Sequence, residues 1–282
     1  MIAAGFLILP LLLFGNATFG GQTMLPADNL FQWQPWSASA EELAIPYPHN
    51  GLLSDLILEN YPWKRFIVES VSAGEIPLWN PSIFAGTPFL ATGQHSAYYP
   101  FSLLFIILPL VKAYGWFTLS QLWLAGVFSY LVGRVLGMRR ASATATGLIF
   151  QGSGFLLVSS AVFPMILGAA IWLPLLLACI EKVIRNASGR DSAGRTLPWA
   201  ALGSVALGAQ LLAGHIEITY YTLLVMAAYA LWRLASRALQ ARRRRPTAGE
   251  SREVPKKPWT ATPLRPAVWR AGMGVLGMLL GA

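Results

Sequence analysis

Residues 116–136 read Trp116-FTLSQLWLAGVFSYLVGRV-Leu136, an apolar run whose single charge is Arg134, close to its end. Such a run has the ~20 residues that a helix needs to cross the hydrocarbon layer of a membrane. The whole chain has the same character, with 55% hydrophobic and 12% charged residues and a mean hydropathy of +0.52. Soluble domains carry about 25% charged residues. The sequence therefore predicts a polytopic, all-α membrane protein.

Further apolar runs define the expected organisation of the chain. Residues 1–20 are predicted to form a first transmembrane helix and 116–236 a bundle of about five spans. Residues 21–115 form a polar, Pro- and Trp-rich loop. Its segment 101–111 is apolar but too short to span, so we interpret it as re-entrant or interfacial. Residues 237–266 are basic and predicted to be disordered, and 267–282 are expected to start a further helix of a longer protein. The predicted spans are 116–136, 143–162, 165–180, 197–214 and 218–234.

The basic residues predict the topology. Lys and Arg gather in cytoplasmic loops. If 101–111 does not span, the clusters around Arg139, Arg185 and Arg242 fall on one side, with the N-terminus, and the 21–99 loop lies outside with most of the acids. The net charge of +9 then reflects anchoring at anionic lipid headgroups. Nucleic-acid binding is disfavoured, because no fold surrounds the basic run to present base-reading side chains.

The outer loop contains a repeated acidic pattern. Both Asp28-NLFQWQ-Pro35-Trp36 and Asp55-LILENY-Pro62-Trp63 read Asp, then Gln or Glu four residues on, then Pro-Trp. On a helix Asp55 and Glu59 would share one face, with Ser54 as N-cap and Pro62 at the end or at a kink. These acids are either solvated charges in a first helical turn or a general base and metal ligands; spacing alone favours solvated charges.

Other polar residues of the loop have two interpretations each. Lys64 and Arg65 either extend toward headgroups or bind phosphate. The segment 74–100 is so rich in Gly and Pro that it requires a fixed, turn-rich loop, in which Asn80, Gln94 and His95 either bind a polar ligand or cap the loop's own backbone.

Gln210 and His215 lie at the outer end of a predicted span, in the segment QLLAGHIE. Polar side chains at such positions are often functional. Gln210 could equally form an interhelical hydrogen bond, and His215 lies where water reaches it.

Three segments, SDLILENYPWKRF (54–66), GEIPLWNPSIFAGTPFLATGQHSAYYP (74–100) and QLLAGHIEITYY (210–221), resemble the YfhO-type bacterial membrane proteins. That family is placed among the GT-C glycosyltransferases, which take sugars from polyprenyl-phosphate carriers on the outer face of the cytoplasmic membrane. The resemblance covers roughly residues 20–235. In the family the Gly-His element usually continues with Pro-Gln, where this chain has Ile216-Glu217, and its members are usually longer.

The resemblance implies roles for particular residues. Asp55 becomes the candidate general base and Asp28 the second candidate, with short loop helices lying along the membrane. Lys64, Arg65 or a divalent cation (Mg²⁺ or Mn²⁺) held by Asp55 and Glu59 would stabilise the leaving phosphate. Trp63 or Trp79 would stack on the sugar. The implied partners are a lipid-linked sugar donor, a cell-envelope acceptor and the bilayer.

Two other classes of function stay open. A transporter or flippase of lipid-linked sugar predicts ionisable residues at the bilayer midplane, whereas the predicted spans hold mainly Gln121, Gln151 and Gln210. A non-catalytic assembly protein, or an inactive fragment of the enzyme, would keep the loop without its chemistry. Motifs of soluble enzymes, such as a phosphate-binding glycine loop or HExxH, are missing from the sequence.

Overall fold

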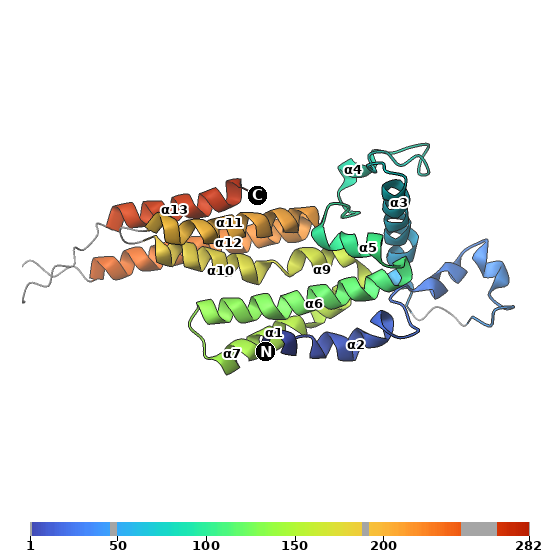
Figure 1. The fold of residues 1–282 in the computed structure, drawn as a ribbon, viewed down its shortest axis with the longest axis horizontal. Coiled ribbons are helices and arrows are strands. Elements are labelled where there is room, and N and C mark those ends of the chain that lie inside the picture. The colour runs from blue at the N-terminus through green and yellow to red at the C-terminus, as the bar shows by residue number, and fades with distance from the viewer. Residues whose placement is uncertain (1, 46–49, 188–191, 244–263, 282) are drawn as a thin grey trace, which may run out of the picture.

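The computed structural model describes residues 2–45, 50–187, 192–243 and 264–281, which form a long helical bundle with a loop region at one end (Figure 1). No strand occurs in these ranges, and a single isolated bridge joins Asn80 to Thr87. The predicted all-α class is therefore confirmed for the described residues. Most of the predicted basic loop, residues 244–263, lies outside them.

Three helical stretches in the described part of the chain are long and apolar enough to cross a membrane. They are α7–α8 (Arg140–Gln151 and Gly154–Val162), α9–α10 (Pro164–Ala170 and Leu173–Asn186) and α12 (Ile216–Arg243). The α9–α10 stretch is mostly buried, whereas the other two expose most of their apolar surface. This arrangement, with one central helix and peripheral helices that face outward, suits a membrane protein.

The remaining long helices pack around this central stretch. They are α6 (Leu110–Val135), α11 (Ser192–Leu212) and α13 (Leu264–Leu280). Helix α6 packs against α2, α7 and α10, and α13 packs against α10 and α11. Helix α6 begins six residues before the predicted span at Trp116, because Pro109 ends the preceding segment in an extended conformation and opens a new helix.

The first apolar block does not form one continuous helix. The residues predicted as a first transmembrane helix, 1–20, form α1 (Ile2–Gly5) and α2 (Ile8–Thr18). Side chains of neighbouring helices donate hydrogen bonds to backbone carbonyls near the interruption between α1 and α2. Trp123 Nε1 donates to the carbonyl of Ala3 (2.8 Å), and Gln151 Nε2 donates to that of Phe6 (2.7 Å). An interrupted apolar helix is tolerated where protein groups satisfy its backbone in this way.

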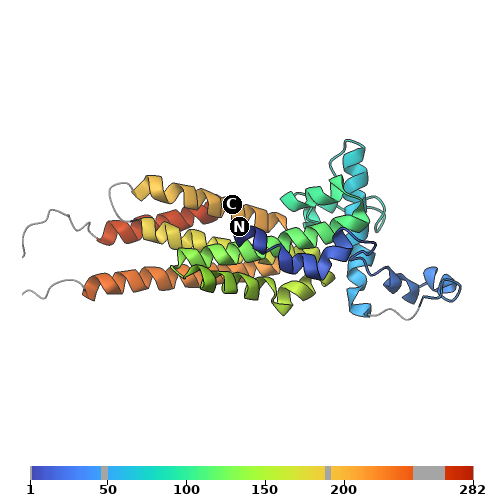
Figure 2. The same cartoon turned by 60° about the horizontal axis from the view of Figure 1, so that its bottom comes forward.

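The loop region consists of short helices at one end of the bundle, and α3 lies across that end (Figures 1 and 2). Segment 101–111 contributes only the five-residue α5 before Pro109, which is too short to span. The elements are η1 (Ala27–Gln32), η2 (Trp36–Ser39), η3 (Gly51–Leu53), η4 (Leu56–Asn60), α3 (Tyr61–Ser72), α4 (Phe89–Thr92), η5 (Pro100–Ser102) and α5 (Leu103–Ile107).

The helix ends with basic residues lie at the opposite end of the bundle from this loop (Figure 1). Arg134 ends α6, Arg140 begins α7, and Arg185 lies in the last turn of α10. The separation of loop and basic ends agrees with the charge pattern. Which end faces the cytoplasm stays a prediction.

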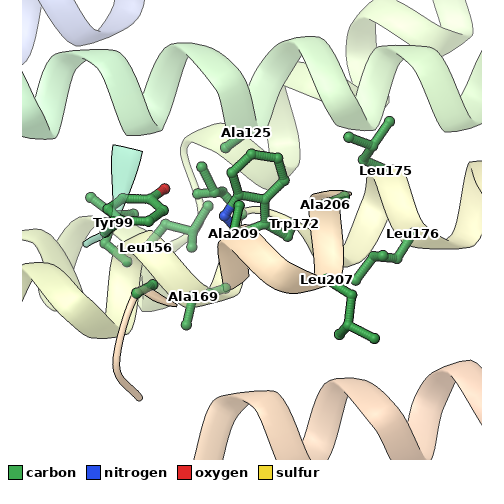
Figure 3. Close-up of a cluster of buried hydrophobic side chains, with 14 of the residues drawn as sticks. Tyr99, Ala125, Leu156, Ala169, Trp172, Leu175, Leu176, Ala206, Leu207 and Ala209 are labelled. Atoms are coloured by element: carbon green, nitrogen blue, oxygen red, sulfur yellow. The ribbon is translucent and has the colours of Figure 1, made fainter. Parts of the chain in front are cut away.

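The core is built from α6, α9–α10 and α11, with many small side chains that let the helices approach closely (Figure 3). Tyr99 enters this core from the loop. Its hydroxyl donates to Gln121 Oε1 of α6 (2.6 Å), and its ring is 2% exposed. The C-terminal part of the loop is therefore anchored inside the bundle.

Candidate functional site

The acids Asp55 and Glu59 are exposed and lie next to each other on the segment that leads into α3. Partial burial and the neighbouring Asp55 carboxylate both raise the pKa of Glu59. This electrostatic coupling agrees with the shared helix face that the i, i+4 spacing predicts. The two acids therefore form one negatively charged patch at the loop end of the molecule.

The helix at these acids differs from the prediction. Of the two positions predicted for Pro62, a helix end or a kink, the end is wrong: Pro62 lies in the first turn of α3, directly after a π turn, and the helix continues to Ser72. The preceding η4 is a π-helical turn, closed by the amide of Tyr61 on the carbonyl of Leu56. A proline clashes with the carbonyl four residues before it, and the wider π turn relieves that clash. Ser54 does not cap this helix, since its hydroxyl donates back to Gly51 O (2.6 Å).

The acidic patch is fixed to the bundle by the buried face of η4. Leu56 and Ile57 pack into the core. Asn60, 1% exposed, accepts a hydrogen bond from the hydroxyl of Tyr114 in α6 (2.9 Å). The carboxylates of Asp55 and Glu59 thus stand on a rigid element, although they face solvent.

Asp28 lies near this region on the other half of the repeated pattern. Its helix η1 packs against η4, and the amide of Asn29 donates to Asn50 O (2.9 Å). The two similar segments nevertheless fold differently. The first forms separate 3-10 turns, whereas the second forms a continuous helix of twelve residues after the π turn.

The two neighbouring cations have contrasting environments. Lys64 is 2% exposed, and its ammonium donates to His95 O (2.7 Å) and Ser102 Oγ (3.2 Å) and lies 4.6 Å from the centre of the Phe105 ring. Burial lowers the pKa of Lys64 to about 7. Arg65 points to solvent and pairs with Glu69 (2.7 Å). Of the two, Arg65 is the accessible one, and Lys64 joins α3 to the loop.

Two polar candidates, Asn80 and His95, form hydrogen bonds with the backbone of the loop itself. Asn80 Oδ1 accepts the amide of Ser82 (2.9 Å), and the Asn80 backbone pairs with that of Thr87. His95 is buried, stacks on Phe89 (4.1 Å between ring centres) and accepts the Ala97 amide at Nδ1 (3.0 Å). Burial, the largest influence, lowers the pKa of His95.

The remaining candidates lie in different surroundings. Trp63 is half-buried on α3, and Trp79 is 56% exposed, with its ring against Gly86, where an added Cβ would lie 2.6 Å from the indole. Gln210 is fully buried and donates to Thr222 Oγ1 of α12 (2.8 Å), which is the interhelical hydrogen bond considered above. Trp79 is the aromatic candidate most open to a ligand.

A second polar surface is formed by two segments that are far apart in the sequence, residues 92–94 and 211–219. Gln94 from the loop and His215 from the turn before α12 line a common cleft of about 270 Å³. Thr92, Glu217 and Thr219 also contribute polar groups to it. Neither Asp55 nor Glu59 lines this cleft, so the structure separates the predicted site residues into an acidic patch and a polar cleft.

Two further acids have clear structural roles. The sequence places Glu217 beside His215 at the outer end of a span but predicts no site role for it, and it lines the cleft. Sequence reasoning missed the second acid. Glu181 is fully buried on α10, and its carboxylate accepts from Arg233 (2.6 and 2.5 Å), from the Tyr229 hydroxyl (2.9 Å) and from Arg185 (2.6 Å). The predicted span ended at Ile180, one residue before this ion-pair network.

Within the described ranges no three His, Cys, Asp or Glu side chains gather closely enough to hold a metal ion by themselves. Two carboxylates such as Asp55 and Glu59 fit the mode in which Mg²⁺ is bound by one or two protein carboxylates and by the phosphates of the substrate.

Comparison of the chain with protein-family models, with curated proteins and with solved structures gives no match in any of the three. The resemblance to YfhO-type proteins is therefore untested and stays a prediction.

Proposed function

We propose that this protein is a membrane glycosyltransferase of the GT-C type, which moves a sugar from a polyprenyl-phosphate donor to a hydroxyl of a cell-envelope acceptor. The proposal depends chiefly on one observation: Asp55 and Glu59 form an exposed acidic patch on a rigid element at the end of the bundle. If the bundle axis follows the membrane normal, α3 lies along the membrane surface (Figure 1), and the acidic patch lies on the segment that leads directly into it.

The chemistry needs few groups. The Asp55 carboxylate accepts the proton of the acceptor hydroxyl as its oxygen attacks the anomeric carbon of the donor sugar. The bond from that carbon to the lipid phosphate breaks, and the electron pair stays on the phosphate. Asp55 and Glu59 would be the residues that hold a divalent cation, which would supply charge stabilisation to the leaving phosphate. Arg65 is the nearby protein cation that reaches solvent.

The lipid part of such a donor requires an apolar groove at the level of the spans. A groove of about 230 Å³ lies between α7–α8, the α9–α10 stretch and α12. Its lining is almost wholly apolar, and α12 presents both this groove and the polar cleft on neighbouring faces of its first turns. The lining residues are Phe150, Phe155, Ala170, Leu173, Ile218, Tyr221, Thr222 and Val225.

The deciding experiment compares Asp55→Asn with Glu75→Gln, an exposed acid of the same loop. Full-length protein in proteoliposomes is given a radiolabelled lipid-linked sugar and a cell-envelope extract as acceptor. Loss of a general base should lower transfer about 10²–10⁴-fold in the Asp55 variant and leave the Glu75 variant active. Equal transfer by both variants contradicts the role of Asp55. Movement of the donor between leaflets without transfer identifies a flippase instead.

A further inference from the structure

The cleft between residues 92–94 and 214–219 has walls that are fixed before any ligand binds. Ser96 Oγ donates to Ala213 O (2.6 Å), which joins the loop directly to the turn between α11 and α12. Gly214 has a φ of +85°, and a Cβ there would lie 2.2 Å from Gly93 O, so the two backbones are in direct contact. On the far side of the loop, Lys64 holds His95 O. Preorganised walls lower the entropic cost of binding.

The cleft presents hydrogen-bonding groups of both kinds. His215 Nδ1 accepts the amide of Ile218 (3.2 Å), so the neutral ring carries its proton on Nε2 as a donor. Burial lowers the pKa of His215, with an opposing effect from Glu217, and the lowered pKa favours the neutral ring. Gln94 adds both a donor and an acceptor, and Glu217 adds acceptors. A lining with both donors and acceptors suits hydroxyl groups, because each hydroxyl can donate and accept a hydrogen bond.

The charge of the lining decides which polar ligand fits. Among the residues that the structure describes, no Lys or Arg lines this cleft, and its one charged side chain is Glu217. A phosphate would therefore meet a like charge without a compensating cation. Leu211 and Ile216 add apolar surface beside the polar groups. A sugar ring combines hydroxyl edges with C–H faces and carries no charge.

We propose that this cleft binds a neutral, hydroxyl-rich group, a saccharide unit, and that it is separate from the acidic patch of Asp55 and Glu59. The volume of about 270 Å³ is near the lower end of ligand pockets, roughly 300–1,000 Å³, so it would hold a small unit or one end of a longer glycan. That this saccharide is the acceptor depends on the proposed function, whereas its binding does not.

The test is saturation-transfer NMR on the full chain in lipid nanodiscs, because sugar-based detergents would compete. The probes are neutral methyl glycosides of a hexose, a pentose and an N-acetylhexosamine, with inorganic pyrophosphate as the competitor. At least one glycoside should bind and resist displacement by pyrophosphate. Gln94→Ala and Glu217→Ala should each weaken it about threefold to tenfold, the range for a lost hydrogen bond. Gln22→Ala, an exposed glutamine elsewhere in the loop, is the matched control.

The possible outcomes separate the two proposals. Binding in both the wild-type protein and Asp55→Asn, with transfer lost only in the latter, supports both of them. Failure of every glycoside to bind, displacement by pyrophosphate, or equal binding by the Gln94 and Gln22 variants overturns the saccharide site, even if transfer depends on Asp55. Glycoside binding that depends on Gln94, with full transfer by Asp55→Asn, supports the cleft and rejects the catalytic base.

Discussion

Lys64 shows how far a residue's environment can change its chemistry. In the sequence it is one of two adjacent cations next to Pro62-Trp63, and both were candidates for phosphate binding. In the structure its amino group is enclosed by the loop and donates to two acceptors, His95 O and Ser102 Oγ. Exposed Arg65 keeps the charge that a phosphate could meet.

Stability should depend on pH through Lys64. Burial lowers its pKa from the ordinary 10.5 to about 7, so between these values the unfolded chain binds a proton that the folded chain does not. The free energy of unfolding should therefore rise with pH across this window, by at most about 1.4 kcal/mol per pH unit, and level off below about pH 7. Thermal unfolding in nanodiscs between pH 6.5 and 9.5 measures this dependence of stability on pH.

Two variants isolate the effect of Lys64. Lys64→Met should lose this contribution to the pH dependence, and Arg65→Met, whose guanidinium stays charged throughout the range, should keep it. The same pH dependence in Lys64→Met and wild-type protein would show that the lysine is not the titrating group.

At the scale of elements, interruptions in helices carry most of the unexpected structure. The apolar pattern predicts where helical segments lie, but not that 1–20 would break near Phe6 or that Pro62 would begin a helix after a π turn. Both features depend on partners distant in sequence, Gln151 and Trp123 for the N-terminal helices and Tyr114 for η4. Local periodicity contains no information about such partners.

The connection between α10 and α12 should depend on Glu181. This fully buried carboxylate accepts two hydrogen bonds from Arg233 and forms an ion pair with Arg185. Its removal therefore leaves two arginines without the carboxylate that they share. Glu181→Gln should lower the free energy of unfolding by about 3–5 kcal/mol. SDS-induced unfolding in mixed micelles, followed by loss of helical circular dichroism, measures the change.

The matched control is Glu69→Gln, which breaks an exposed ion pair with Arg65. The side chain of Arg65 is 65% exposed and that of Glu69 is 59% exposed. An exposed i, i+4 pair contributes only about 0.3–0.5 kcal/mol. A loss in Glu181→Gln no greater than that in the control would show that the buried network does not hold the two helices together.

At the scale of the whole molecule, the loop and the basic helix ends lie at opposite ends of the bundle (Figures 1 and 2). Because Lys and Arg gather on the cytoplasmic side, the loop end should face outward. The single native cysteine, Cys179, is buried, so introduced cysteines can report on each end.

Ala91→Cys, in the loop next to the cleft, should react with a membrane-impermeant maleimide in intact cells. Ala141→Cys, at the exposed start of α7, is its counterpart at the basic end and should react only after the cells are permeabilised. The reverse labelling pattern would invert the topology and place both candidate sites in the cytoplasm.

The sequence by itself determined the all-α class, the approximate positions of the long helices and the loop in which the acids lie. Those features follow from the local density of apolar residues and from i, i+4 spacing, which nearby residues encode. Only the tertiary structure decided that Lys64 and His95 are internal to the loop, that Glu181 is buried in an ion-pair network, and that Gln94 and His215 share a cleft. Each depends on contact between segments tens of residues or more apart, such as Ser96 with Ala213, and such contacts form only when the chain packs.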